Sequence, residues 1–322
     1  MFTRLARFSG ALGARLLVVT LAILAIIFAP VAFSSDQQPA AQEPDKQESK
    51  KKDEGKVPTE QELEQNRKNQ QAAKPGVVKL SPVESVVEIA IIAYGGRQQL
   101  QTVRNAIHEE GTIRLASAQG DLTGTYNLRS IRGEKSSKDL LRIDLLLTPP
   151  EEVRRQGAGQ ISYVIAFNGA SVWSAQNNQY VTPGPDAEAA FRAQLTHDYM
   201  TLLRYKEDGS KIELVGPETV VGVATNVVDL TTPEGEKTRF WVSAKTYRII
   251  HAEYELKLAE SQTPTKYRIS YFYTPFRVVQ NTLVPTRRVM QQDGKFAQEI
   301  VINRAIFSAK LSPEIFQHLQ EQ

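Results

Sequence analysis

The chain has 322 residues, of which 41% are hydrophobic, so it can form a sizeable globular core. It contains no cysteine, which excludes disulfides, thiolate metal sites, a cysteine nucleophile and lipid attachment at a lipobox cysteine. The net charge of +3 comes from Arg4, Arg7 and Arg15, because residues 1–34 contain no acid and the remaining 36 basic residues (39 − 3) balance 36 acidic ones. A neutral body lacks the clustered positive charge that binds phosphates, so we expect no nucleic-acid partner.

The first 34 residues have the pattern of an export signal. A basic start precedes an apolar run over residues 16–33, and the small residues of Ala32-Phe33-Ser34 predict cleavage before Ser35. The run also approaches the roughly 20 residues that span a bilayer, so an uncleaved membrane anchor is the alternative. In both cases we expect an exported, periplasmic domain, either free or tethered to the inner membrane by residues 16–33.

Residues 35–80 are predicted to form a disordered, charged linker. The segment is rich in Gln, Lys, Glu, Pro and Ala, includes the run Lys50-Lys51-Lys52 and contains no aromatic residue. It cannot bury enough apolar surface to offset the entropy lost on ordering. The folded domain is therefore expected over residues 81–322.

The domain is predicted to open with a capped helix. Ser81 is the expected N-cap, Pro82 occupies the first helical position and Glu84 completes a capping box. Apolar residues then recur at helical spacing up to Tyr94. The pair Gly95-Gly96 is expected to end the helix, because glycine accepts a left-handed C-terminal cap.

Alternating apolar residues predict strands in the next part of the chain. Three runs have period two, at Leu122–Leu128, Leu141–Leu147 and Ile161–Phe167. Asn168-Gly169 predicts a hairpin after the third run.

A second helix is predicted from Asp186 to about Tyr205, since apolar residues from Phe191 to Leu202 form one stripe. Further strands are expected at 211–216, 219–231, 237–243, 247–258, 265–274, 283–291 and 296–307, separated by turn signals such as Gly216-Pro217 and Asp293-Gly294. Two helices with such a meander indicate an α+β fold, an incomplete antiparallel β-barrel (half-barrel) wrapped over helices.

No catalytic or metal-binding motif is found. The histidines at positions 108, 197, 251 and 318 have no metal-ligand spacing, and no nucleophile elbow or phosphate loop occurs. Glu109 and Glu110 are adjacent in a strand and are expected to point to opposite faces, so they cannot form an acid–base pair. We expect a protein that is not an enzyme, with no cofactor and no metal.

The order of these elements resembles the LolA/LolB-like superfamily of periplasmic lipoprotein carriers, especially the outer-membrane lipoprotein-sorting type. Matching segments follow one another along nearly the whole domain. They are 94–96, 110–114, Phe167-Asn168-Gly169 with Val172-Trp173, 216–222, Phe240-Trp241-Val242 with Lys245-Thr246-Tyr247, Leu283-Val284-Pro285-Thr286-Arg287, Asp293-Gly294, Ile302-Asn303 and Phe316. Known carriers have a basic-Arg-Pro segment whose arginine helps to close the cavity. The aligned residues 136–142 lack the proline and offer Arg142 as a latch.

The resemblance implies an apolar cavity that shields the acyl chains of lipoproteins or lipids, with transport proteins of the inner or outer membrane as further partners. The inward-facing apolar residues of the strands are candidates for its lining. They are Leu141, Ile143, Leu145, Tyr163, Ile165, Phe167, Ile269, Tyr271 and Tyr273. Ordinary core packing is the alternative role for each of them. A carrier predicts a cavity of several hundred Å³. The alternatives are an envelope-stress regulatory module that binds a protein partner, and an enzyme or accessory structural protein.

Overall fold

The computed structural model describes residues 80–258 and 265–318. The predicted signal or anchor segment and the linker up to residue 79 lie outside the described residues, and both stay predictions. Over the two described ranges, every helix is too short or too polar to cross a bilayer.

Fifteen strands are found in the described part of the chain. The strands before the second helical region are β1 (Ala106–Leu115), β2 (Leu122–Ile131), β3 (Leu140–Thr148), β4 (Ile161–Phe167), β5 (Val172–Gln176) and β6 (Gln179–Val181). Those after it are β7 (Lys211–Val220), β8 (Val223–Thr231), β9 (Lys237–Ser243), β10 (Ile249–Leu258), β11 (Thr265–Tyr273), β12 (Phe276–Val279), β13 (Thr282–Pro285), β14 (Arg287–Gln292) and β15 (Lys295–Phe307).

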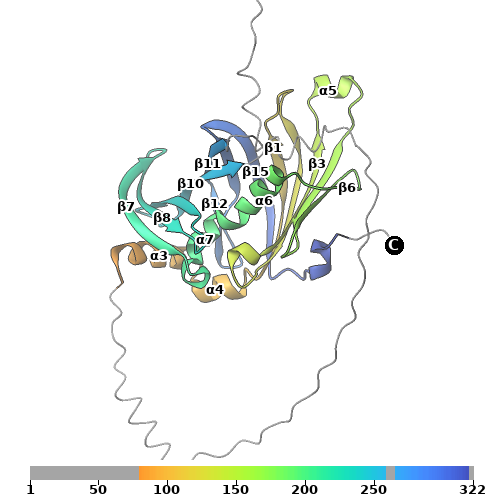
Figure 1. Ribbon diagram of the computed structural model, residues 1–322. Helices are drawn as coiled ribbons and strands as arrows, with labels where there is room; N and C mark the ends of the chain where they lie inside the picture. Colours follow the sequence, from red (N-terminus) through yellow and green to blue (C-terminus); the bar gives the residue numbers. More distant parts are fainter. Residues whose placement is uncertain (1–79, 259–264, 319–322) are drawn as a thin grey trace, which may run out of the picture. The chain divides into compact units, whose positions relative to one another are not determined.

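Thirteen of these strands form one antiparallel sheet. Its order is β6-β5-β4-β3-β2-β1-β15-β14-β11-β10-β9-β8-β7, and β12 pairs only with β13. The two halves of the sheet join where β1 pairs with β15. The sheet curves strongly, but its edge strands β6 and β7 are not paired with each other (Figure 1). The predicted α+β class with a large antiparallel sheet is confirmed, and the sheet is open rather than closed.

The helices lie in the hollow of the sheet and at both of its ends (Figure 1). They are α3 (Pro82–Ala93), α4 (Arg97–Thr102), α5 (Glu151–Arg155), α6 (Pro185–Thr196), α7 (Tyr199–Leu203) and α8 (Tyr205–Asp208), with 3-10 turns η1 (Ser136–Lys138) and η2 (Pro313–Phe316). Helices α6 and α7 cross the concave side, α3 and α4 lie at one end of the sheet, and α5 lies at the other (Figure 1). The predicted opening helix is confirmed as α3, with the capping box between Ser81 and Glu84 and with φ of +119° at Gly95.

The prediction of one continuous second helix is wrong. The chain breaks between α6 and α7, where Asp198 has extended backbone angles and its side chain accepts a hydrogen bond from the N–H of Met200. An Asp side chain competes for backbone donors in this way, which favours a new helix start over a helix interior.

The predicted turn at Gly216-Pro217 is also wrong. Strand β7 continues through this pair with a β-bulge between Leu214 and Gly216. Proline is tolerated because β7 is an edge strand, where its missing N–H removes no ladder hydrogen bond. The turn instead falls at Val221-Gly222, both with positive φ.

Three apolar clusters fill the domain. The first packs the concave faces of β1 to β4 and β15 against Phe191 and Leu195 of α6. The second joins α3 and α7 to β8, β9 and β10. The third lies on β10, β11, β14 and β15 under Ala193 of α6. The space between the clusters, on the concave side, holds the candidate site.

Candidate functional site

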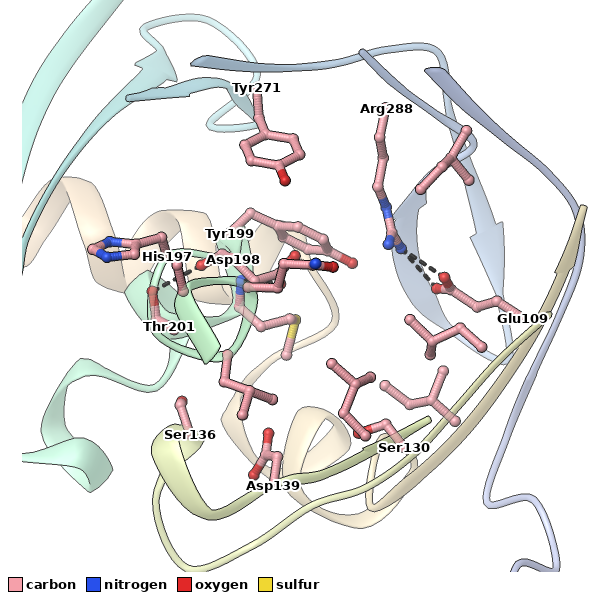
Figure 2. A pocket seen from close by; sticks show the side chains of 18 of the residues that line it. Glu109, Ser130, Ser136, Asp139, His197, Asp198, Tyr199, Thr201, Tyr271 and Arg288 are labelled. Atoms are coloured by element: carbon pink, nitrogen blue, oxygen red, sulfur yellow. Dashed lines mark hydrogen bonds and ion pairs between the residues drawn. The ribbon is translucent and has the colours of Figure 1, made fainter. Parts of the chain in front are cut away.

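A cavity of about 130 Å³ lies between the sheet and helices α6 and α7 (Figure 2). Its wall combines aromatic and aliphatic side chains with charged ones. The lining residues are Arg104, Ile107, Glu109, Tyr126, Leu128, Ser130, Ser136, Asp139, Leu141, Ala193, Gln194, Leu195, His197, Asp198, Tyr199, Met200, Thr201, Tyr254, Tyr271, Tyr273, Arg288, Gln298 and Ile300. The cavity is smaller and more polar than the sequence predicted.

A buried ion pair forms one side of the cavity. Nη2 of Arg288 on β14 lies 2.8 Å from both carboxylate oxygens of Glu109 on β1, and the Glu109 side chain is 2% exposed (Figure 2). Burial by itself would lower the pKa of Arg288, but Glu109 and the surrounding acidic groups outweigh burial and raise it. Both carboxylate oxygens of Glu109 accept hydrogen bonds from Arg288, so the pair forms a polar side of the cavity.

Asp198 stands on the opposite side of the cavity, at the start of α7. One of its carboxylate oxygens caps the helix through the N–H of Met200 at 2.9 Å. Burial raises the pKa of Asp198, and the positive charge of Arg288 only partly opposes this effect. Protonation of Asp198 is therefore more favourable than that of an ordinary aspartate.

His197 is held in one orientation beside the cavity. Its ring stacks on Tyr254 at 3.8 Å between centroids, and Nδ1 lies 2.6 Å from the hydroxyl oxygen of Thr238. Burial lowers the pKa of His197 to about 4. The imidazole is therefore neutral at physiological pH.

The structure brings three of the nine predicted lining residues to the cavity, namely Leu141, Tyr271 and Tyr273. The remaining six lie in the apolar clusters. Ile143, Leu145, Tyr163, Ile165 and Phe167 belong to the cluster under Phe191 and Leu195, and Ile269 belongs to the cluster under Ala193. These six residues share the concave face with the cavity but pack in clusters that also contain residues of α6.

Arg142 lies on the other face of β3 from Leu141, since neighbouring strand residues point to opposite sides. Its guanidinium donates to both oxygens of Asp144 and, at 2.7 Å, to the carbonyl oxygen of Ile315. It also stacks over Trp173, whose Nε1 donates to the carbonyl oxygen of Phe316. A latch would need a guanidinium on the cavity side, so Arg142 fastens the C-terminal turn η2 to the sheet instead.

The polar part of the site is not apparent from sequence motifs. On β1, Glu109 occupies the face that Ile107 and Ile113 also occupy, and it is the one charged residue at an apolar position of that alternation. A charge at such a position is a sign of a functional or paired group. Its neighbour Glu110 points to the other face, as predicted, and lies near Arg304.

This arrangement can bind and orient a ligand that has both apolar and polar parts. The cavity offers tyrosine rings, an ion pair and a carboxyl group with a raised pKa. Across residues 80–258 and 265–318, no group of three or more histidine and acidic side chains is placed to hold a metal ion.

No family model matches the sequence, and no curated protein matches it. Several solved structures have a similar fold. A DUF1329 family protein from Desulfovibrio piger is 15% identical, with a TM-score of 0.48 over 74% of this chain and 98% of that one. A LolA superfamily protein from Nitrosomonas europaea is 15% identical, with a TM-score of 0.45 over 74% and 99%. A structure described as an outer membrane lipoprotein-sorting protein domain, from Vibrio parahaemolyticus, is 13% identical, with a TM-score of 0.44 over 72% and 94%.

Proposed function

We propose that this protein is an exported, non-catalytic carrier that binds the acyl chain of a lipid or lipoprotein on the concave side of its sheet. The observation that supports the proposal is the cavity between the sheet and α6, whose walls continue into the apolar clusters. Transfer of a 16-carbon chain from water into such surroundings is worth on the order of 10 kcal/mol, at roughly 0.8 kcal/mol per methylene, before the costs of binding.

The cavity of about 130 Å³ is too small for a long chain, because pockets for ligands of that size have roughly 300–1,000 Å³. Helix α6 must therefore move when the chain binds. On its β10–β11 side it contributes Ala189, Ala190 and Ala193, whose methyl groups bury little area. At about 0.8 kcal/mol per methyl-sized group, their contacts amount to roughly 2 kcal/mol, well below the gain from a bound chain.

Lipid analysis of the isolated protein tests this proposal. The full chain is isolated from the envelope of expressing cells and examined by native mass spectrometry, and the same sample is extracted for lipids. We expect acyl lipid or lipoprotein at close to one equivalent. A ligand-free mass, together with no uptake of a fluorescent fatty acid, would contradict the carrier function and favour the regulatory module.

A role in outer-membrane lipoprotein sorting is the finer part of the proposal. It predicts that the protein captures a lipoprotein with its acyl chains but not the same lipoprotein without them. Equal capture of both forms would indicate recognition of the polypeptide, as expected for a module with a protein partner.

A further inference from the structure

Arg104, which follows α4, is a buried cation without a carboxylate partner among the described residues. It is 3% exposed. Its Nη2 donates to the Tyr199 hydroxyl at 2.7 Å, its Nη1 faces Sδ of Met200, and its guanidinium lies 4.7 Å from the centre of the Phe307 ring. The Nε atom has no hydrogen-bond partner. A buried charge without a counterion is unfavourable, so we expect a ligand or another charged group to compensate Arg104.

Arg288 also has an N–H donor without an acceptor. Its Nη2 is held by Glu109, but its Nε has no partner. The two guanidinium groups flank one ring, with their carbons 5.6 Å (Arg104) and 6.0 Å (Arg288) from the centre of Tyr199. Both arginines line the cavity. Each of these two arginines therefore has one buried N–H donor without an acceptor.

None of the acids of the lining accepts a hydrogen bond from the Nε atoms of Arg104 and Arg288. Glu109 accepts hydrogen bonds from Arg288, and Asp139 accepts two hydrogen bonds from Nη1 of Arg204, at 2.9 and 2.8 Å. Asp198 is the remaining acid of the lining, and one of its carboxylate oxygens accepts the N–H of Met200. The two Nε donors are therefore free to bind an acceptor brought by a ligand.

We propose that the cavity binds the anionic oxygen head group, carboxylate or phosphate, of an amphiphile, and that Arg104 is the residue that recognises it. This inference rests on the proposed carrier function and adds the chemical class of the ligand. A guanidinium matches the geometry of these oxyanions and forms strong, charge-assisted hydrogen bonds with them. A volume of about 130 Å³ suits a head group, and the chain then extends under α6 along the apolar cluster of β10, β11, β14 and β15.

Calorimetric titration of the full chain with matched ligands tests the inference. Dodecanoate, dodecyl phosphate, dodecanol and dodecyltrimethylammonium share one chain and differ in the head group, and all are used below their micelle concentrations. Acetate and inorganic phosphate carry the oxyanion without the chain. We expect the two anionic amphiphiles to bind roughly tenfold or more tightly than dodecanol, and dodecyltrimethylammonium to bind most weakly of the four dodecyl ligands. Acetate and inorganic phosphate should bind far more weakly than the two anionic amphiphiles.

The variant Arg104→Met should bring dodecanoate and dodecanol to within about twofold of each other, because the charge-assisted bonds are lost. Arg304→Met is the matched control, since the Arg304 side chain is 64% exposed and outside the cavity, and it should keep the full preference. Arg104→Lys keeps the positive charge and should keep the order of the ligands with a smaller preference. The order in the wild-type chain tests the inference even if Arg104→Met does not fold.

The outcomes separate the two proposals. Equal affinities for all four dodecyl ligands in the wild-type chain, or an unchanged preference in folded Arg104→Met, would overturn the inference while the carrier function stands. Acetate or phosphate binding as tightly as dodecanoate would show a site for small anions and overturn the assignment to an amphiphile. No binding of any dodecyl ligand would contradict the carrier function itself.

Discussion

Replacement of Ala193 by leucine separates ligand binding from folding. Ala193 is buried on α6 and lines the cavity. A leucine adds three carbons, and the cavity of about 130 Å³ has room for them. At roughly 0.8 kcal/mol per buried carbon, the variant gains up to about 2 kcal/mol in free energy of unfolding. For a domain of this size that is a rise of roughly 4–8 °C in Tm. The same side chain occupies the space through which an acyl chain enters.

Scanning calorimetry and titration with a fluorescent fatty acid measure the two effects. We expect a higher Tm together with at least tenfold weaker binding. Glu188→Leu, on the same helix but at a side chain that is 39% exposed and outside the cavity lining, is the control and should bind normally. Unchanged fatty-acid affinity in a stabilised Ala193→Leu protein would refute the assignment of the cavity as the acyl site. A lower Tm would show that the leucine overpacks the helix interface instead of filling the cavity.

Three further changes test the surroundings of the site. Burial lowers the pKa of His197 from 6.5 to about 4, so as the pH falls the unfolded chain binds this proton before the folded chain does. The contribution of His197 to the free energy of unfolding is therefore complete above about pH 6.5 and falls by about 3 kcal/mol as the pH drops towards 4. Urea unfolding at several pH values should show that His197→Gln removes this dependence. Glu109→Gln leaves Arg288 buried without its counterion and should cost about 3–5 kcal/mol, whereas Glu151→Gln at an exposed pair should cost less than about 1 kcal/mol; similar losses in chemical denaturation would refute the burial argument. Val221 has a φ of +48° and is 80% exposed, so Val221→Asn should raise stability by about 1 kcal/mol, and a lower melting temperature would contradict the proposed backbone strain.

Local sequence signals predicted local structure well. The capping box at Ser81 and Glu84 forms as expected, because its two hydrogen bonds join residues only three positions apart. The alternation in β3 correctly shows that Leu141 and Ile143 share the buried face, since strand geometry alone decides this. Local sequence signals gave wrong predictions where the tertiary environment of a residue decides its secondary structure. Pro217 reads as a turn residue, but the position of β7 at the edge of the sheet lets the strand continue.

The sequence by itself therefore determined the class of fold and the concave face, and the tertiary structure decided which part of that face is a site. Leu141 and Ile143 follow the same pattern and pack in one cluster with Phe191 and Leu195, yet only Leu141 also lines the cavity. Glu109 and Arg288 are 179 residues apart and meet only because β1 and β14 flank β15. A buried charge is tolerable only beside its partner, and no local pattern contains that pairing.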